Sequence, residues 1–572
     1  MRSARRAHLS GYVAAVTVGL CCLGAGAAST VPGLGLPNGA AASPHRCLVV
    51  TSAGDTPFAR NFNPFVSPLD FTWGGIYEPL IVVTNADGGR RYNWLASGLA
   101  WSRDGRTLTL TVRSGVRWSD GVPLTNRDVL YTLTAGRQDE AMDQIGLMRP
   151  GNLVESIRLV GSRRVAIRLK SRDSTFVDSV LANNLRVVPE HVFAKVENIS
   201  AWSNPDPVGT GPFAVVERFD GQGYTLAKNP HYWLKGAPRI PCILRVPSAS
   251  GESAILQMAN GDIDLTNNYV PNVEKTYVSR DPRYFHYFYS AATTPVGLYF
   301  DDTKYPYSLA AFRKAISRAV DRETISRFAE FGYAPPVDAI GINRIWNDWV
   351  DPPLRAAARR LASYSPAEAR RMLVAAGFTY RQGALFDPRG NRVSIKTKVI
   401  AGWTDWVTAW EIIGRNLSDI GIRVDVEAVP TWGAWQPDAF STRVATLLWS
   451  NAPSGPTPAP YFAQNLDRAA FVPSGQSAEG TGNWAHFQSA EGTRLLRAFR
   501  NTLDRNEQRR VVGKLGRLWL DVLPFVPLFA GPQWSTYSTK HFVGFPSRSN
   551  FYIQPSFQTS DYVVALTRIR PA

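Results

Sequence analysis

Apolar positions along the chain follow two different spacings, and these spacings predict an α/β fold. Residues 108–113 alternate apolar and polar side chains with a period of two, as a half-buried strand does. Residues 308–328 repeat apolar side chains at helical spacing and predict a helix with these residues on one face: Ala310, Phe312, Ala315, Ile316 and Ala319. Because both kinds of segment alternate throughout the chain, we expect α/β lobes.

Three further segments carry helix signals. Ser365 stands in the N-cap position before Pro366, and Gly377 follows the last periodic residue, so residues 365–377 predict a helix with defined ends. The same periodicity recurs in residues 410–420 and 491–503.

The first 42 residues predict an export signal and linker. Three arginines near the start precede an apolar, small-residue stretch at residues 11–28, and small-residue cleavage sites follow at 25–27 and 40–42. The remaining sequence has no second stretch that is long and apolar enough to span a bilayer. We therefore expect an exported protein, periplasmic or at the cell surface.

The export route and a lipid anchor stay open in the leader. Arg5 and Arg6 resemble a twin-arginine signal, but ordinary signal peptides also carry paired arginines. Cys21 and Cys22 stand where a lipoprotein cysteine could lie. Leu20, however, occupies the position before Cys21 where a small residue is usual, so two apolar signal-peptide residues are the alternative.

Length and charge narrow the class of protein. A chain of 572 residues is too long for one hydrophobic core, so two or three packed units are expected. The formal charge of +17 could indicate a nucleic-acid partner. The 63 basic residues include only 11 lysines, are scattered, and form no run of five. Together with the export signal, this pattern favours a solvated basic surface and no nucleic-acid partner.

Two cysteines remain beyond the leader. Cys47 and Cys242 each stand in a strand-like run. In an exported protein two such cysteines can form a disulfide, and two buried free thiols are the alternative. We expect no metal site, because two sulfurs have no histidine pair beside them.

The sequence contains no motif of nucleophilic, phosphate-binding or zinc-dependent catalysis. H-E-x-x-H, G-x-x-x-x-G-K-[ST], G-x-S-x-G and C-x-x-C are absent, and the seven histidines are isolated. The acid pairs Asp301/Asp302 and Asp262/Asp264 could in principle serve a glycosidase, but adjacent surface acids are far commoner. We predict no catalytic residue and no cofactor, and therefore a protein that is not an enzyme.

A series of longer motifs follows along the chain: Asn63–Phe65, Ile76–Leu80, Trp101–Val129, Val208–Phe213, Lys228–Trp233, Gly261–Leu265 and Phe312–Arg322. In these segments the chain resembles the family 5 extracytoplasmic solute-binding proteins of ABC transporters, the dipeptide/oligopeptide-binding class. The resemblance runs from about residue 45 to 560.

This resemblance implies a bilobal periplasmic-binding-protein-like fold of type II, in the large cluster that has an extra subdomain, with a ligand cleft between the lobes. Lobe I would comprise residues 43–91, 205–295 and 515–572, with an inserted subdomain at 92–204, and lobe II residues 296–514. The strands that carry Cys47 and Cys242 would then lie side by side, which favours the disulfide. The implied partners are membrane permease subunits, and we expect a monomer.

The resemblance also bears on the ligand. Peptide-binding relatives carry an aspartate in the stretch that aligns with residues 447–462, where it pairs with the peptide ammonium, and this chain has no acid there. Losing a buried countercharge would cost a peptide several kcal/mol. Residues 455–458, 527–539 and 544–550 instead resemble the branch that binds β-linked oligosaccharides such as cello-oligosaccharides.

Indole rings and amides supply the candidate ligand contacts, because an indole can stack on a sugar ring and an amide can pair with hydroxyl groups. For the tryptophans the alternative is core packing, which we expect for Trp118 and Trp233. An oligopeptide-binding protein and a ligand sensor that is not coupled to import remain alternative functions. The candidate ligand-binding residues are Trp73, Asn267, Asn268, Trp403, Trp406, Trp432, Trp435, Trp449, Asn451, Gln533 and Trp534.

Overall fold

The computed structural model describes residues 46–572 apart from 53–56, 67–68, 85, 87–88, 150–151, 249–250, 343, 442–445 and 451–454. The predicted leader, with Cys21 and Cys22, lies outside the described residues, and so does Asn451. Within the part of the chain that the structure describes, no helix combines the length and the apolar character needed to cross a membrane.

One hydrophobic core draws its residues from 48–288 and 537–569. This part of the chain forms a seven-stranded mixed sheet, in which β1 pairs in parallel with β10 on one side and with β11 on the other. The strand order is β12 (Phe285–Tyr287), β20 (Thr536–Ser538), β11 (Leu265–Thr266), β1 (Leu48–Thr51), β10 (Cys242–Arg245), β9 (Tyr224–Ala227) and β8 (Val215–Phe219).

A four-stranded antiparallel sheet adds to the same core. Its order is β4 (Ala96–Trp101), β5 (Thr107–Val112), β7 (Arg164–Leu169) and β6 (Val154–Val160). Strand β5 confirms the strand predicted at 108–113, and it buries alternate residues as the pattern requires. Helix α1 (Asn126–Thr134) packs on β6 and β7, and Thr125 and Asp128 form a capping box at its start.

The short elements of this part are β2 (Ile81–Val83) with β3 (Arg91–Asn93), α2 (Glu190–Phe193), α3 (Gly251–Asn260), α4 (Val273–Thr276), α14 (Val563–Leu566) and the pair β21 (Phe542–Val543) with β22 (Arg570–Pro571).

A second core draws its residues from 296–529. Its central sheet has the order β18 (Thr446–Ser450), β13 (Ser290–Phe300) and β19 (Val526–Gln533). Residues 515–529, which the resemblance assigned to lobe I, contribute Leu515, Trp519 and Phe529 to this second core. The division of the chain into lobes and an inserted subdomain remains a prediction.

The prediction of one continuous helix at 308–328 is wrong. The structure has α5 (Ala310–Ala319) and α6 (Arg322–Phe328), with extended backbone at Val320. Asp321 begins the second helix, because its carboxylate accepts a hydrogen bond from the backbone N–H of Thr324.

The other helix predictions hold with shifted ends. Residues 365–377 contain α8 (Pro366–Ala375) with Ser365 as N-cap, and Gly377 has the positive φ expected of a residue that ends a helix. Residues 410–420 fall mostly in α9 (Thr404–Ser418), and 491–503 in α12 (Ala490–Asn501). The remaining helices of this core are α7 (Pro352–Ala362), α10 (Trp432–Phe440), α11 (Ala459–Leu466) and α13 (Arg505–Val522).

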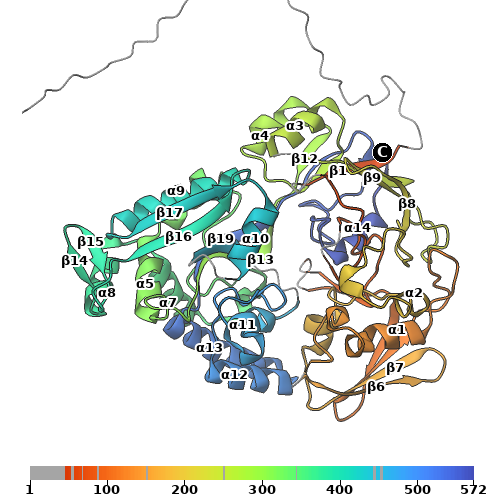
Figure 1. Ribbon diagram of the computed structural model, residues 1–572, viewed down its shortest axis with the longest axis horizontal. Helices are drawn as coiled ribbons and strands as arrows, with labels where there is room; N and C mark the ends of the chain where they lie inside the picture. Colours follow the sequence, from red (N-terminus) through yellow and green to blue (C-terminus); the bar gives the residue numbers. More distant parts are fainter. Residues whose placement is uncertain are drawn as a thin grey trace, which may run out of the picture. The chain divides into compact units, whose positions relative to one another are not determined.

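Helix α9 connects the parallel strands β16 (Ser394–Ile400) and β17 (Arg423–Val429) and lies along them (Figure 1). A small hairpin of β14 (Thr379–Arg381) and β15 (Ala384–Phe386) precedes this unit.

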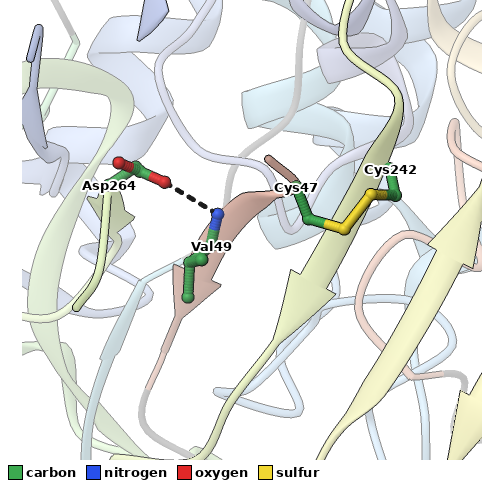
Figure 2. The surroundings of a disulfide bond; sticks show 4 residues. All are labelled: Cys47, Val49, Cys242 and Asp264. Atoms are coloured by element: carbon green, nitrogen blue, oxygen red, sulfur yellow. Dashed lines mark hydrogen bonds between the residues drawn. A yellow bond between two sulfur atoms is a disulfide. The ribbon is translucent and has the colours of Figure 1, made fainter. Parts of the chain in front are cut away.

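Cys47 and Cys242 form a disulfide, with Cα atoms 4.5 Å apart (Figure 2). The bond joins the starts of β1 and β10, where Leu48 lies opposite Ile243. The N–H of Val49 donates to Asp264 at 3.0 Å, which ties β1 to the segment before β11. The structure thus confirms that the two cysteine-bearing strands are neighbours.

Candidate ligand-binding site

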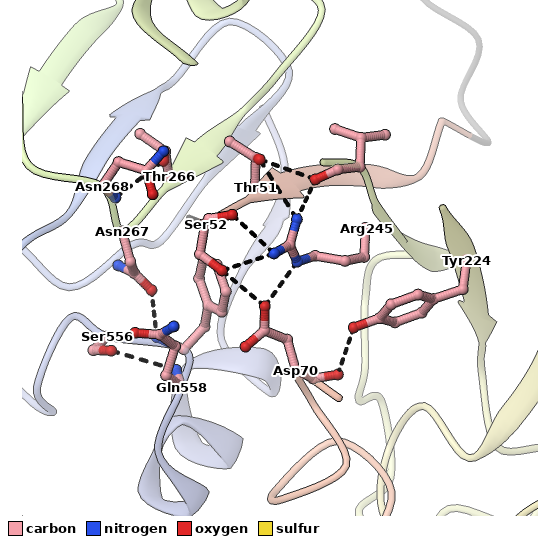
Figure 3. A network of polar contacts seen from close by, with 12 residues as sticks. Thr51, Ser52, Asp70, Tyr224, Arg245, Thr266, Asn267, Asn268, Ser556 and Gln558 are labelled. Carbon is pink, nitrogen blue, oxygen red and sulfur yellow. Dashed lines mark hydrogen bonds and ion pairs between the residues drawn. The ribbon is translucent and has the colours of Figure 1, made fainter. Parts of the chain in front are cut away.

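The carboxyl ends of β1, β10 and β11 lie together at one edge of the seven-stranded sheet (Figure 3). In α/β proteins, ligands bind preferentially outside this edge of parallel strands. The residues at these ends are polar and include Thr51, Ser52, Arg245, Thr266 and Asn267.

Arg245 connects the strand ends and is only 2% exposed. Its Nε donates to the Asp70 carboxylate at 2.7 Å, and its terminal nitrogen donates to the Ser52 hydroxyl at 2.8 Å and the Ser52 carbonyl at 2.9 Å (Figure 3). Ser52 also donates to Asp70 at 2.9 Å. Because the buried charge is paired and hydrogen-bonded, the network fixes the loop that contains Asp70 against the sheet edge.

Asn267 uses both ends of its side-chain amide within the protein. Nδ2 donates to the carbonyl of Trp534 at 2.5 Å, and Oδ1 accepts from the N–H of Phe557 at 2.9 Å. This geometry makes Asn267 a support for the backbone of Trp534. Asn268 is 5% exposed, and its Nδ2 donates to the Ser248 hydroxyl at 3.4 Å.

Trp534 follows directly after β19 and packs against two tyrosines. Its ring centroid lies 5.0 Å from that of Tyr269 and 4.7 Å from that of Tyr289, both in edge-to-face geometry. Gln533, the last residue of β19, has a buried side-chain oxygen without a hydrogen-bond partner among the residues that the structure describes. A buried amide oxygen that lacks a donor is unfavourable, and a ligand hydroxyl group could supply one.

Five predicted tryptophans meet in one cluster, although they come from three separate segments. Trp449 on β18 lies at its centre. The ring centroids of the other four lie between 5.1 and 6.1 Å from that of Trp449: Trp403 at the N-cap of α9, Trp406 in α9, and Trp432 and Trp435 in α10. Trp435 is 1% exposed and serves packing, whereas the other four are half-buried.

Trp73 is half-buried, lies between the core residues Phe71 and Ile76 in the sequence, and has different neighbours. Its Nε1 donates to the Pro64 carbonyl at 3.1 Å, and the guanidinium of Arg186 lies 3.8 Å above its ring. Burial lowers the pKa of Arg186 to about 9. The described ring contacts of Trp73 do not include the cluster around Trp449.

Glu78 lies in the segment Ile76–Leu80, one of those that resemble the family, and its carboxylate is buried among three aromatic side chains. Its carboxylate accepts from Nε1 of Trp94 at 2.7 Å and from the Tyr232 hydroxyl at 3.0 Å, and Trp233 donates to it at 3.3 Å. Desolvation by burial raises the pKa of Glu78 to about 7, although these donors oppose the shift. Trp118 is fully buried, as a scaffold role requires.

Sequence reasoning missed two buried acids near the aromatic residues, Glu330 and Asp405. Asp405 lies in the sequence between Trp403 and Trp406. Because both tryptophans were predicted to contact the ligand, they could have drawn attention to Asp405. Glu330 follows α6 without any distinguishing motif. Among the residues that the structure describes, no group of three or more His, Cys, Asp or Glu side chains could hold a metal ion.

The family model of the bacterial extracellular solute-binding proteins, family 5 Middle, matches residues 91–471. The chain belongs to family 5 of the extracellular solute-binding proteins. This solute-binding protein is therefore of the peptide-binding class of ABC transporters, and it is a binding protein and not an enzyme. The family predicted from the sequence and the prediction that the protein is not an enzyme are both confirmed.

Curated relatives of this solute-binding protein match it along most of their length. Protein XP55 of Streptomyces lividans is 27% identical over 70% of this chain and 69% of its own. The oligopeptide-binding protein AppA of Bacillus subtilis is 22% identical over 72% of this chain and 73% of its own. For five Brucella relatives that are 26% identical, the chain spans 60% of their length.

Solved structures share the fold of this solute-binding protein. A periplasmic oligopeptide-binding protein of Thermotoga maritima, with bound mannohexaose, superposes with a TM-score of 0.83 over 92% of this chain and 99% of its own, at 24% identity. AppA of Bacillus subtilis, in complex with a nonapeptide, gives a TM-score of 0.73 over 93% of this chain and 100% of its own, at 19% identity. The mixed α/β fold is thus that of the family 5 peptide-binding structures.

Proposed function

We propose that this protein, once its leader has directed export, captures an oligosaccharide and delivers it to the permease subunits of an ABC importer. The ligand that we propose is a β-linked chain of the cello-oligosaccharide kind. The aromatic cluster around Trp449 carries the proposal, because half-buried indoles offer apolar platforms that match the flat faces of sugar rings.

Polar groups beside Trp534 support the same ligand. The buried oxygen of Gln533 has no donor within the described part of the chain and can accept a hydrogen bond from a sugar hydroxyl. Asn267 fixes the backbone of Trp534, so the adjacent indole is held by the protein before a ligand arrives. A preorganised aromatic surface loses little conformational entropy on binding.

The Thermotoga maritima structure adds support, since that oligopeptide-binding protein was crystallised with mannohexaose. An oligopeptide is the second candidate ligand, favoured by the nonapeptide in AppA. Against it stands the lack of an acid anywhere in residues 447–462. A sensor that binds the same ligand without feeding a permease would be distinguished by uptake of labelled ligand into cells with and without the protein.

A thermal-shift screen of the leaderless protein tests the proposal. A ligand present at 100 times its dissociation constant stabilises the folded state by about 2.7 kcal/mol, which raises the melting temperature. We expect cello-oligosaccharides to raise it and di- to pentapeptides to leave it unchanged. The opposite pattern would assign the protein to peptide transport.

A further inference from the structure

One face of the four-stranded sheet β4–β5–β7–β6 lies away from the hydrophobic core. Strands β5 and β7 send alternate residues into that core: Leu108, Leu110, Val112, Val165, Ile167 and Leu169. Because neighbouring residues of a strand point to opposite sides, the intervening residues form the outer face of the sheet. The polar members of this outer face include Thr107, Thr109, Thr111, Arg158, Arg164 and Arg168, and its other positions are glycine, alanine, serine and valine.

The hairpin of β6 and β7 concentrates positive charge beside this face. Residues 154–172 contain six basic residues and one acid, Glu155, whereas the whole chain has 63 basic and 46 acidic residues. The excess of positive charge is therefore local and exceeds the chain's general basic character.

Three arginines of the hairpin are free of acid partners. Arg168 lies 3.3 Å from the carboxylate of Glu155, so its charge is compensated. Arg158, Arg163 and Arg164 are exposed, and within the part of the chain that the structure describes they form no ion pair and no side-chain hydrogen bond. Neighbouring guanidinium groups without carboxylates repel one another, and a bound anion relieves this repulsion.

The spacing of the free donors suits a chain with regularly repeated anionic groups. Arg158 lies opposite Ala166, two residues from Arg164. The two arginines are therefore diagonal neighbours on adjacent strands, with Cα atoms about 7 to 8 Å apart. The threonines of β5 follow at intervals of about 7 Å along the same face. Arginine and threonine side chains are common donors to the phosphate oxygens of extended polymers.

The outer face lacks the apolar groups that other anionic partners need. Surfaces that bind anionic membranes add large apolar side chains that enter the bilayer, and surfaces that bind single-stranded nucleic acids add aromatic rings for base stacking. The exposed Trp101 and Leu159 belong to the opposite face, because the register pairs them with the buried Leu108 and Val165. These observations favour a soluble, linear polyanion.

We propose that the outer face, through Arg158, Arg163 and Arg164, binds a linear polymer that carries phosphate groups at regular intervals. Such binding would retain the exported protein at an anionic envelope polymer. The proposal does not depend on the proposed function, since it uses no residue of the candidate ligand site and holds for a sugar or a peptide ligand.

Calorimetric titration of the leaderless protein with linear inorganic polyphosphate, at salt concentrations from about 50 to 200 mM, tests this surface. We expect saturable binding that weakens as salt rises, because phosphate contacts release counterions from the polymer. The absence of binding at the lowest salt concentration would overturn the proposal without any variant.

Two further probes distinguish the partners. Vesicles of equal parts phosphatidylglycerol and phosphatidylcholine present a lipid surface, and a single-stranded oligonucleotide presents bases. We expect both to bind more weakly than polyphosphate at the same phosphate concentration. Tighter binding of either probe would contradict the polymer assignment.

A triple variant locates the contact. Arg158→Gln/Arg163→Gln/Arg164→Gln should weaken polyphosphate binding at least about tenfold at low salt. The slope of log affinity against log salt should become shallower by about 2, since three phosphate contacts on a flexible strand contribute about 0.7 each. Cooperative thermal unfolding checks that the variant is folded. If it is not, the single changes Arg158→Gln and Arg163→Gln replace it, each with a smaller loss in the same direction.

The matched control removes the same net charge elsewhere. Arg392→Gln/Arg415→Gln/Arg497→Gln changes three exposed arginines, one just before β16, one on α9 and one on α12. This variant should keep the wild-type affinity and salt slope for polyphosphate. Equal losses in the two triple variants would show that only the total charge matters and would reject the outer face as a binding surface.

Discussion

Asn267 holds Trp534 in place: its Nδ2 donates to the Trp534 carbonyl at 2.5 Å while its Oδ1 accepts the N–H of Phe557 at 2.9 Å. The three residues come from the end of β11, the segment after β19 and the C-terminal region. One amide therefore connects three segments at the edge where the parallel strands end.

Replacing Asn267 with Ala should therefore act on the ligand through Trp534. We expect Asn267→Ala to weaken oligosaccharide binding by roughly 1 kcal/mol, the scale of a hydrogen bond that positions a contact. In a double-mutant cycle, Asn267→Ala should add little to Trp534→Ala, because both changes remove the same interaction. Additive losses would show that the two residues act independently.

The cluster around Trp449 leads to a second prediction. Trp449→Ala should weaken oligosaccharide binding by roughly 1 to 3 kcal/mol, as the loss of an aromatic stacking surface does. Trp101→Ala is the control, since Trp101 is a 39% exposed residue of β4, in the four-stranded sheet. An unchanged dissociation constant for Trp449→Ala would remove this indole from the binding surface.

The disulfide makes a prediction about stability. Cys47 and Cys242 are separated by 195 residues, and closing so long a loop stabilises the folded state by roughly 5 kcal/mol in the chain-entropy model. The leaderless protein should show no free thiol when denatured without reductant. Its Cys47→Ser/Cys242→Ser variant should unfold at lower urea concentration. Two titratable thiols in the wild-type protein would disprove the bond.

Glu78 predicts how stability depends on pH. Its pKa is about 7 in the folded protein, against a reference of 4.5. Between these values the folded state binds more protons than the unfolded state, so the free energy of unfolding falls as pH rises. The contribution of Glu78 to the free energy of unfolding is fully present below about pH 4.5. Up to about 3 kcal/mol of this contribution is lost by about pH 7.

Urea unfolding of the wild-type protein and Glu78→Gln across this range checks the prediction. The variant should show a smaller decline than the wild-type protein, whatever its absolute stability. A decline should remain, because burial also raises the pKa of Asp561 to about 6 and raises the pKa values of Asp302 and Glu330 well above their ordinary range. Parallel curves for the two proteins would mean that Glu78 does not titrate in this window.

The sequence was sufficient to predict the family, the α/β fold and the pairing of the cysteine-bearing strands, because these depend on motifs spread along the whole chain. The break between α5 and α6 was missed, although Asp321 and Thr324 carry an N-cap signal. Apolar periodicity alone continues through that break, since both helices bury one face in the same core.

The candidate site was predicted less completely, since its residues depend on tertiary contacts. Tryptophans from three segments were singled out from the sequence, and the structure brings them together around Trp449. The hydrogen bonds that the Asn267 amide forms with Trp534 and Phe557 could not be predicted from the residues around Asn267 in the sequence. The burial of Glu330 also follows from packing and not from its neighbours in the sequence. The ligand-binding roles of these residues remain predictions.

The most direct test of the account is a tryptophan-fluorescence titration of the leaderless protein with a cello-oligosaccharide and, separately, with di- to pentapeptides. Trp449 and Trp534 are half-buried and should change their emission when a sugar ring covers them. We predict a saturable shift with the oligosaccharide and none with the peptides. Saturable binding of a peptide at micromolar concentration, with no response to any oligosaccharide, would contradict the oligosaccharide assignment.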